Sequence, residues 1–317
     1  MPVTNTNTNM TNRTELKPSL SGVIQQLMDR EMEANLVHAQ FGKAINVPRN
    51  AGTSTATLRR WVELDPSTTV LQEGVVPDPK LLSQESVSIP LAAYGEYVKI
   101  TDKLDYTALD KPMVDSVQLL SRMGARSLDL VVRGVLSAAT NVLYANGKTS
   151  RTELTKDTDA LTSKDVQKAV RLLERTNTRK INGDFIGILG PDTKYMLMND
   201  PMWIDVAKYQ DAAKLYNNEV GKLYGVRFVE TSEASILEGA GASSADVAQT
   251  FIFGDQAYAT TQLSGGGQPR IIVKPLGSAG AEDPLDQFGT VGYKVEGYGA
   301  AIINQTHLVC IESALLD

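Results

Sequence analysis

Cysteine and histidine are scarce in this chain of 317 residues. Cys310 is the one cysteine, which excludes an intramolecular disulfide framework and a cysteine-based zinc finger. His38 and His307 are the two histidines, which argues against a multi-histidine metal site. We therefore expect this protein to hold no metal ion.

Long apolar runs and an excess of positive charge are also missing. No run approaches the ~18 consecutive apolar residues that a membrane-spanning helix needs, and residues 1–20 lack the apolar segment of a secretory signal. The formal net charge of −6 argues against a dominant basic face for nucleic acid. We expect a globular protein of a reducing cytoplasm, or one packaged from there, without a membrane partner.

The N-terminal region has two parts of different composition. Residues 4–14 are almost entirely Thr and Asn, which buries no apolar surface and predicts a solvated tail or a partner-dependent arm. Residues 21–40 have the pattern of a modest amphipathic helix ending near Gly42. Its apolar residues recur at near-helical spacing: Val23, Leu27, Met32 and Leu36.

Residues 53–100 predict an extended hairpin. Residues 55–64 have a strand-like pattern, and residues 86–100 have a second one with partly alternating polar and apolar side chains. Proline and glycine punctuate the connection between them. An isolated two-stranded hairpin is marginal in water, so this one must lie on its own domain or on a neighbouring subunit.

The clearest helix is predicted over residues 112–144, with Pro112 at its start and Asn146-Gly147 as its C-terminal cap. At 1.5 Å per residue it would be ~50 Å long and would span the whole subunit as a spine. The residues expected on its apolar stripe are Met113, Val117, Leu120, Leu128, Val131, Val135, Ala138 and Val142. Those expected on its opposite, polar side are Arg122, Arg126, Asp129 and Arg133.

The remainder of the chain predicts mixed helix and strand. Thr162 with Asp165 is a capping-box candidate for a helix through Leu173. The predicted strands are residues 185–189, 226–230 and 250–253 and three stretches within residues 270–312. Helices are predicted from Gly190-Pro191-Asp192 to Met198 and over residues 203–216.

Motifs for nucleotide binding are incomplete. Residues 146–149 (NGKT) resemble the end of a phosphate-binding loop, but Val142 stands where that loop needs glycine. The glycines at 265–267 and 297–299 lack the complete dinucleotide fingerprint and its following helix. We interpret the glycines in residues 289–299 as bulges or close backbone approaches.

Side chains suited to catalysis also fail to form a recognisable group. An alternating strand would place His307 and Cys310 on opposite faces, and Cys310 fits a buried apolar position. His38 fits a surface or packing role better than that of a base. Asp283 and Asp286 have no accompanying nucleophile, and Asp283-Pro284 more simply starts a turn. We therefore name no catalytic, cofactor-binding or metal-binding residue, and we expect no cofactor and no enzymatic activity.

Two segments carry a resemblance to a known family. GKLYGVRFVETSEA (residues 221–234) and DPLDQFGTVGYKVEGYGAAIIN (residues 283–304) resemble major capsid proteins of tailed bacteriophages, in particular the podovirus-type branch. The resemblance extends over nearly the whole chain by order of elements. It implies an α+β fold, the Hong Kong 97-like shell fold of phage major capsid proteins.

The resemblance also implies a division of the chain. Residues 1–52 would be an N-terminal arm, 53–100 an extended loop, and 101–183 a peripheral domain with the spine helix. Residues 184–264 would be an axial domain, and residues 265–317 would return to the peripheral sheet.

The function implied by the resemblance is structural. The subunit would self-assemble into hexamers and pentamers of an icosahedral head that encloses double-stranded DNA without sequence-specific contacts. A portal and a decoration protein are further implied partners. A separate scaffolding protein is also expected, because some relatives carry a long helical scaffolding segment before the shell domain and only about fifty residues precede the extended loop here. Some relatives cross-link through a lysine in that loop. Lys80 is the one lysine between Trp61 and Val98, and we interpret it as a solvated residue.

Two alternatives remain open at this point. One is a soluble α/β enzyme or ligand-binding protein with a site near Gly190-Pro191-Asp192. The other is a different virion protein, such as a decoration or tail subunit.

Overall fold

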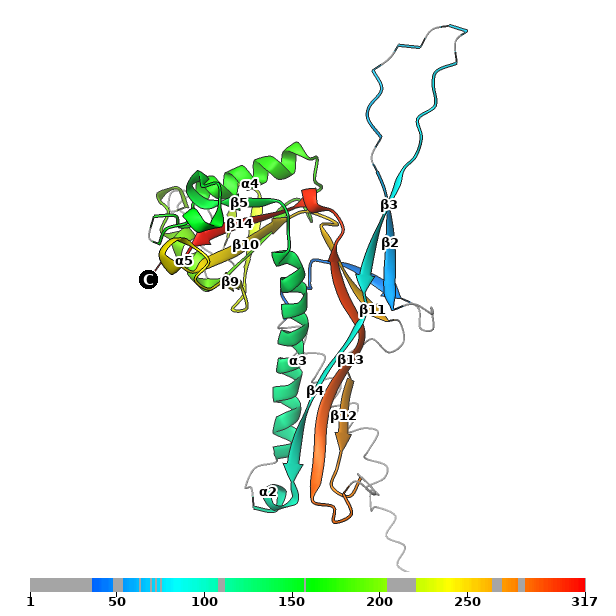
Figure 1. Ribbon diagram of the computed structural model, residues 1–317, viewed down its shortest axis with the longest axis vertical. Helices are drawn as coiled ribbons and strands as arrows, with labels where there is room; N and C mark the ends of the chain where they lie inside the picture. Colours follow the sequence, from blue (N-terminus) through cyan, green and yellow to red (C-terminus); the bar gives the residue numbers. More distant parts are fainter. Residues whose placement is uncertain are drawn as a thin grey trace, which may run out of the picture.

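The computed structural model describes residues 36–47, 54–62, 64–68, 70–71, 73–74, 76–107, 112–156, 158–203, 221–263, 270–278 and 283–316. A globular lobe lies at one side of an elongated body, and a hairpin projects away from both (Figure 1). Within these residues no helix has the length and apolar character needed to cross a bilayer.

The elongated body is a sheet with one long helix against it. Its strands, which we call the spine sheet, are β1 (Lys43–Val47), β4 (Ala92–Thr101), β11 (Tyr258–Leu263), β12 (Arg270–Lys274) and β13 (Phe288–Ile302). β13 pairs antiparallel with β4, β12 and β11, and β1 adds in parallel to β11. Helix α3 (Pro112–Ser137) covers one face, so side chains along β13 alternate between buried and partly exposed. The short helix α2 (Asp102–Thr107) joins β4 to α3.

The lobe contains the second sheet, which we call the lobe sheet. Its strands are β5 (Val142–Tyr144), β14 (Leu308–Ala314), β10 (Val247–Phe253), β6 (Phe185–Leu189), β8 (Val226–Glu230) and β7 (Lys222–Leu223), in that order, with β9 (Ser235–Leu237) beside β10. Helices α4 (Ser163–Arg175) and α5 (Pro191–Met198) contribute to a core with Ile252, Val309 and Ile311. Short 3-10 turns complete the connections: η1 (Ala145–Gly147), η2 (Arg151–Glu153), η4 (Ala242–Ser244) and η6 (Gln305–His307).

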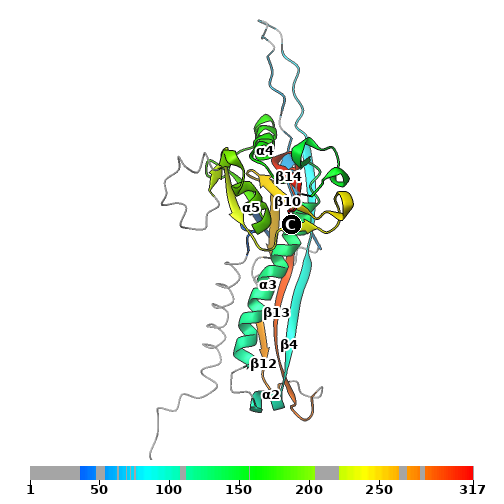
Figure 2. The same cartoon turned by 90° about the vertical axis from the view of Figure 1, so that its left-hand side faces the viewer.

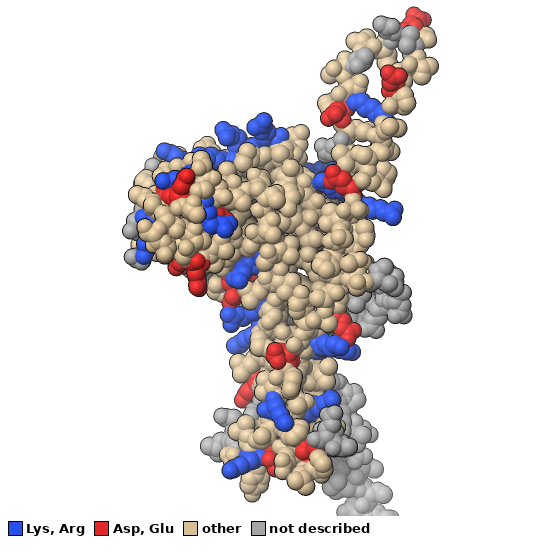
Figure 3. Space-filling view, in the orientation of Figure 1, with Lys and Arg blue, Asp and Glu red and all other residues tan. Residues whose placement is uncertain are grey.

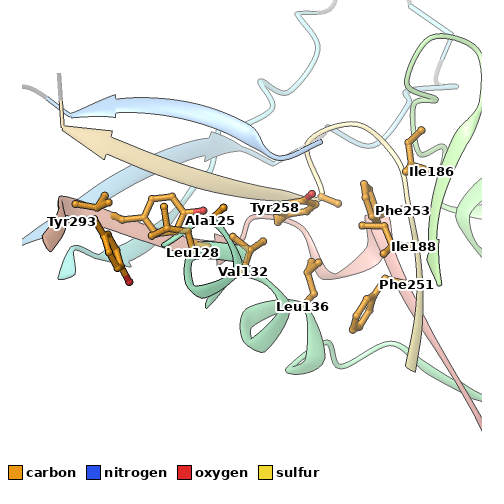
Figure 4. Packing of buried hydrophobic residues seen from close by; sticks show 14 of the residues in the cluster. Ala125, Leu128, Val132, Leu136, Ile186, Ile188, Phe251, Phe253, Tyr258 and Tyr293 are labelled. Carbon is orange, nitrogen blue, oxygen red and sulfur yellow. The ribbon is translucent and has the colours of Figure 1, made fainter. Parts of the chain in front are cut away.

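The two parts share one hydrophobic core. Leu128, Val132 and Leu136 of α3 lie in the same buried cluster as Phe251 and Phe253 of the lobe sheet. Figure 4 shows these side chains filling the space between the helix and the two sheets. The lobe is therefore packed directly onto the C-terminal end of the spine helix.

The spine helix is shorter than predicted. α3 ends at Ser137 and has 26 residues, which is about 39 Å at 1.5 Å per residue. Its last turn tightens through bonds from the amides of Ala138 and Ala139 to the carbonyls of Val135 and Leu136. The chain then becomes β5, which pairs with β14. Asn146-Gly147 is consequently no helix cap: it lies in η1, with positive φ at both residues.

The buried stripe of α3 also differs in its second half. Val117, Leu120 and Leu128 are buried as predicted. Farther along, Val132, Leu136 and Ala139 are buried, whereas Val131 and Val135 are partly exposed and Ala138 is exposed. The apolar pattern was compatible with both faces, and packing against the lobe selected one. Asp129, predicted on the polar side, is buried.

Several strand predictions require correction. Residues 86–100 form two strands, because the chain leaves β3 (Gln84–Pro90) at Leu91 and joins the spine sheet as β4. Only β3 pairs with β2 (Thr55–Trp61) in the hairpin. β14, expected in the peripheral sheet, pairs with β10 and β5 in the lobe sheet instead. Its buried side chains complete the lobe core, which local pattern cannot distinguish from another apolar face.

Two helix predictions need separate comment. The Thr162–Asp165 capping box does not form in the predicted way: the Thr162 hydroxyl donates to the Asp165 carboxylate, and Asp200 accepts from the Ser163 amide at the start of α4. Residues 36–42 form bends and turns rather than the end of a helix. Predictions for residues 1–35, 204–216 and 265–267 lie outside the described residues.

Candidate functional site: an assembly surface

The projecting hairpin has a paired base and an open tip. β2 and β3 pair from Thr55 opposite Pro90 to Trp61 opposite Gln84. The amide of Val62 donates to the Ser83 carbonyl, and beyond that bond the two chains separate (Figures 1 and 2). We call residues 62–83 the loop tip. Lys80 is exposed, in agreement with its interpretation as a solvated residue, and its Nζ donates to the Asp65 carbonyl across the tip.

The loop tip exposes large apolar side chains. Val76 is 89% exposed and Leu81 is 86% exposed. Burying an apolar side chain of this size is favourable by roughly 1.5–3 kcal/mol relative to leaving it in water. The further exposed apolar residues of the tip are Val62, Leu64, Val70, Leu71 and Leu82. Apolar groups presented together at a projecting end are typical of a contact surface for another molecule.

The base of the hairpin is held firmly by its own chain. Ala56 and Ile89 are buried in one cluster with Val47, Ala259 and Ile303. Arg60 and Glu85 form an ion pair across the two strands. The subunit therefore fixes where the tip starts, and no other described part of the subunit covers the tip.

A buried hydrogen bond between His38 and Asp129 anchors the segment that precedes β1. His38 Nδ1 lies 2.6 Å from Asp129 Oδ2 of α3, and both side chains are almost fully buried. The other carboxylate oxygen, Asp129 Oδ1, accepts from the amides of His38 at 2.7 Å and Ala39 at 3.2 Å. The Tyr258 hydroxyl donates to the His38 carbonyl, and burial raises the pKa of Tyr258. His38 thus has the packing role that the sequence favoured.

A second buried network ties α3 to the lobe sheet. Glu312 of β14 is fully buried and accepts two bonds from the Arg151 guanidinium, at 2.8 and 2.6 Å. Gln249 donates to Glu312 and accepts from the Ser235 hydroxyl, which accepts in turn from Ser137 at the end of α3. Such a connected network stabilises one orientation of the lobe on the helix.

The NGKT segment is a structural loop. Asn146 donates from Nδ2 to Asp159 at 2.9 Å, and Lys148 Nζ lies 3.7 Å from the same carboxylate. Asp159 also accepts from the amide and hydroxyl of Thr155. Burial alone would raise the pKa of Asp159, but these hydrogen bonds and Lys148 outweigh it and lower that pKa. The lysine is thereby directed toward a protein carboxylate.

His307 and Cys310 do not form a joint site. His307 lies in η6, with its Nδ1 3.1 Å from the Asp255 carbonyl. Cys310 is fully buried in β14, where burial raises the pKa of its thiol. Among the described residues, no group of three or more His, Cys, Asp and Glu is placed to hold a metal ion.

The remaining candidates have structural explanations as well. Asp283 accepts from the Phe288 amide and starts a turn closed by Asp286, as predicted. At Gly190, before α5, an added Cβ would lie 2.8 Å from the Ala234 Cβ. Ala234 therefore packs tightly against this turn. The pairing of β13 with β4 shifts register between Val295 and Tyr298, which confirms a bulge in the glycine-rich stretch.

Comparison with known proteins gives the family. Residues 84–311 match the model of a family described as phage capsid protein. The chain belongs to the phage capsid protein family. It is a structural protein of the phage head shell, and the resemblance noted in its sequence is confirmed.

Solved phage capsid structures share the fold of this capsid protein. The capsid of Ralstonia phage GP4 aligns with a TM-score of 0.70 at 12% identity, covering 89% of this chain and 88% of the other. The Cyanophage Pam1 capsid aligns with a TM-score of 0.68 at 16% identity, covering 87% and 88%. Mycobacterium phage Che8 gives 0.60 at 14% identity, covering 87% and 91%. The predicted α+β capsid fold is confirmed. No curated protein gives a significant match.

The apolar residues of the tip were not singled out from the sequence. A signal was present, because apolar pairs such as Val70-Leu71 and Leu81-Leu82 stand in a segment punctuated by proline, with neither helical nor strand period. Only the structure shows that no other described part of the subunit covers them.

Proposed function

We propose that this capsid protein assembles into hexamers and pentamers of an icosahedral head, and that each loop tip packs on a neighbouring copy. The observation that carries this proposal is the exposed apolar surface of the tip, beginning directly after a firmly held base. Capsid subunits associate with one another, and head-to-tail contacts between identical copies close into rings.

The energetics favour burial of the tip at such a contact. Burying one large aliphatic side chain stabilises an interface by roughly 1.5–3 kcal/mol. Val70, Leu71, Val76, Leu81 and Leu82 together could therefore contribute roughly 7.5–15 kcal/mol before the cost of ordering the tip. Association itself costs about 4–15 kcal/mol in lost translational and rotational freedom, so the tip would offset much of that cost and act together with other contacts between copies.

The proposal has further parts. The head encloses double-stranded DNA without sequence-specific contacts, as suits a subunit with a net charge of −6. A portal, a scaffolding protein and a decoration protein are proposed partners, and the role is non-enzymatic. We assign the lobe as the axial domain and the elongated body as the peripheral domain, so that β5, α4 and β14 belong with the former.

Electron microscopy and size-exclusion chromatography of the purified full chain test the proposal. We expect rings, sheets or closed shells under conditions that favour assembly. A protein that stays strictly monomeric across protein concentration and ionic strength would contradict it. Saturable small-molecule binding by that monomer would instead support the alternative of a ligand-binding protein.

A further inference from the structure

The outer side of α4 is strongly basic. Its apolar side packs into the lobe core, and the residues that face outward lie at helical spacing. Arg171 and Arg175 are exposed one turn apart, and Arg179 is exposed just beyond the helix end. Within the described residues none of the three forms an ion pair. Figure 3 shows Lys and Arg gathered along this upper edge of the lobe.

Acidic side chains lie on a different side of the same lobe. Asp192 is exposed in the first turn of α5. Glu238 follows β9 and Asp246 precedes β10, and both are exposed. In both ribbon views α4 lies at the top of the lobe and α5 lies below it (Figures 1 and 2). Figure 3 shows Asp and Glu on the lower side.

We propose that the basic edge, Arg171, Arg175 and Arg179, docks on the acidic edge, Asp192, Glu238 and Asp246, of the next copy. The inference rests on the proposed ring assembly and names a contact separate from the loop tip. A surface that pairs with a different surface of an identical copy is the head-to-tail geometry that generates rings. Opposite charges at the two edges would orient each arriving copy and oppose a head-to-head encounter.

A second copy fits the basic edge better than nucleic acid does. The outward side of α4 also carries Glu174, which pairs with Lys180 at 3.2 Å. This exposed carboxylate would lie close to a phosphate backbone placed along the helix. The same lobe carries a matching acidic edge, so one contact between two copies would pair the basic residues of one with the acidic residues of the other.

Charge reversal with complementary rescue tests the contact. In the full chain, the Arg171→Glu/Arg175→Glu variant and the Asp192→Lys/Glu238→Lys variant should each lower the yield of assembled particles by about tenfold. Asp246 is left unchanged because its Oδ1 accepts from the Gly239 amide at 2.7 Å. The variant carrying all four substitutions should recover most of the yield, because both edges are reversed together. The Lys103→Glu/Lys274→Glu variant, which reverses two exposed lysines of the elongated body, should assemble as the wild type does.

The outcomes separate this contact from the proposed function. Circular dichroism should show the same fold in all monomers, because the substituted side chains are exposed. If the wild type assembles and Arg171→Glu/Arg175→Glu assembles equally well, the contact is wrong and the shell function stands. If the Arg171→Glu/Arg175→Glu variant assembles but its particles retain less DNA, the basic edge binds nucleic acid and the proposed contact between copies is wrong. A wild type that never assembles would overturn both.

Discussion

Gly299 of β13 lies directly against Pro90 at the end of β3, so closely that a Cβ on Gly299 would be 2.1 Å from the Pro90 carbonyl oxygen. Ile89 Cγ2 would also lie within 3.3 Å of that Cβ. This contact is where the hairpin rests on the spine sheet. The direction of the loop tip therefore depends on the absence of a side chain at one position.

The Gly299→Ala substitution should loosen this contact. Backbone atoms cannot yield as a flexible side chain does, so we expect a loss of about 1–3 kcal/mol in the free energy of unfolding. Urea denaturation of the variant and the wild type measures this difference in the free energy of unfolding. Gly134→Ala is the matched control, because Gly134 lies in α3 with nothing within 4 Å of an added Cβ, and alanine there should be neutral or stabilising by up to about 1 kcal/mol. Equal effects at both sites would contradict the close-contact explanation.

The Asp129→Ala substitution should be among the most damaging to stability. It leaves the buried His38 side chain and the amides of His38 and Ala39 without their acceptor. A buried donor left without its acceptor costs about 1–3 kcal/mol, so the three together should cost at least about 3 kcal/mol. Asp115→Ala, at an exposed site in the first turn of the same helix, should cost less than about 1 kcal/mol. Chemical denaturation of both variants compares them, and a small effect at Asp129 would refute the anchoring role.

The free energy of unfolding should decrease at acid pH, in part because Asp159 becomes protonated. Its pKa is lowered in the folded protein, so the unfolded chain takes up this proton first as pH falls. The stabilisation is complete well above the ordinary aspartate pKa of about 3.9 and is lost as pH falls through the lower folded value. Asp159→Asn should therefore show a weaker loss of melting temperature between neutral pH and pH ~3. An unchanged pH profile would exclude this contribution.

Polar substitutions in the loop tip should separate assembly from folding. Val76→Ser/Leu81→Ser changes two highly exposed residues, so the stability of the monomer should change by less than about 1 kcal/mol. Assembly into particles, followed by light scattering, should fall sharply. Leu285→Ser is the control, since Leu285 is 75% exposed outside the tip. Normal assembly of the double variant would mean that the tip is not the principal contact.

Prediction from sequence was accurate where one local pattern had one explanation. The helix at α3, the strand at β6 and the start of α5 at Pro191 follow from periodicity and from proline at a helix start. Prediction failed where two environments suit the same residues. Val142 continues the apolar stripe of α3 in sequence, yet it pairs with Cys310 in the lobe sheet. The burial of Asp129 was missed because its partner, His38, is 91 residues away.

The amino-acid order by itself determined the family, the spine helix and the presence of a hairpin, since each depends on neighbouring residues or on a short, specific sequence segment. The tertiary structure alone decided which sheet contains β14 and which face of α3 is buried. It also decided that the base of the hairpin is buried while, among the described residues, nothing covers the tip. These features depend on contacts between segments that are distant in the sequence. The free energy that an apolar side chain gains by burial is about the same in one core as in another, so the local pattern does not select between them.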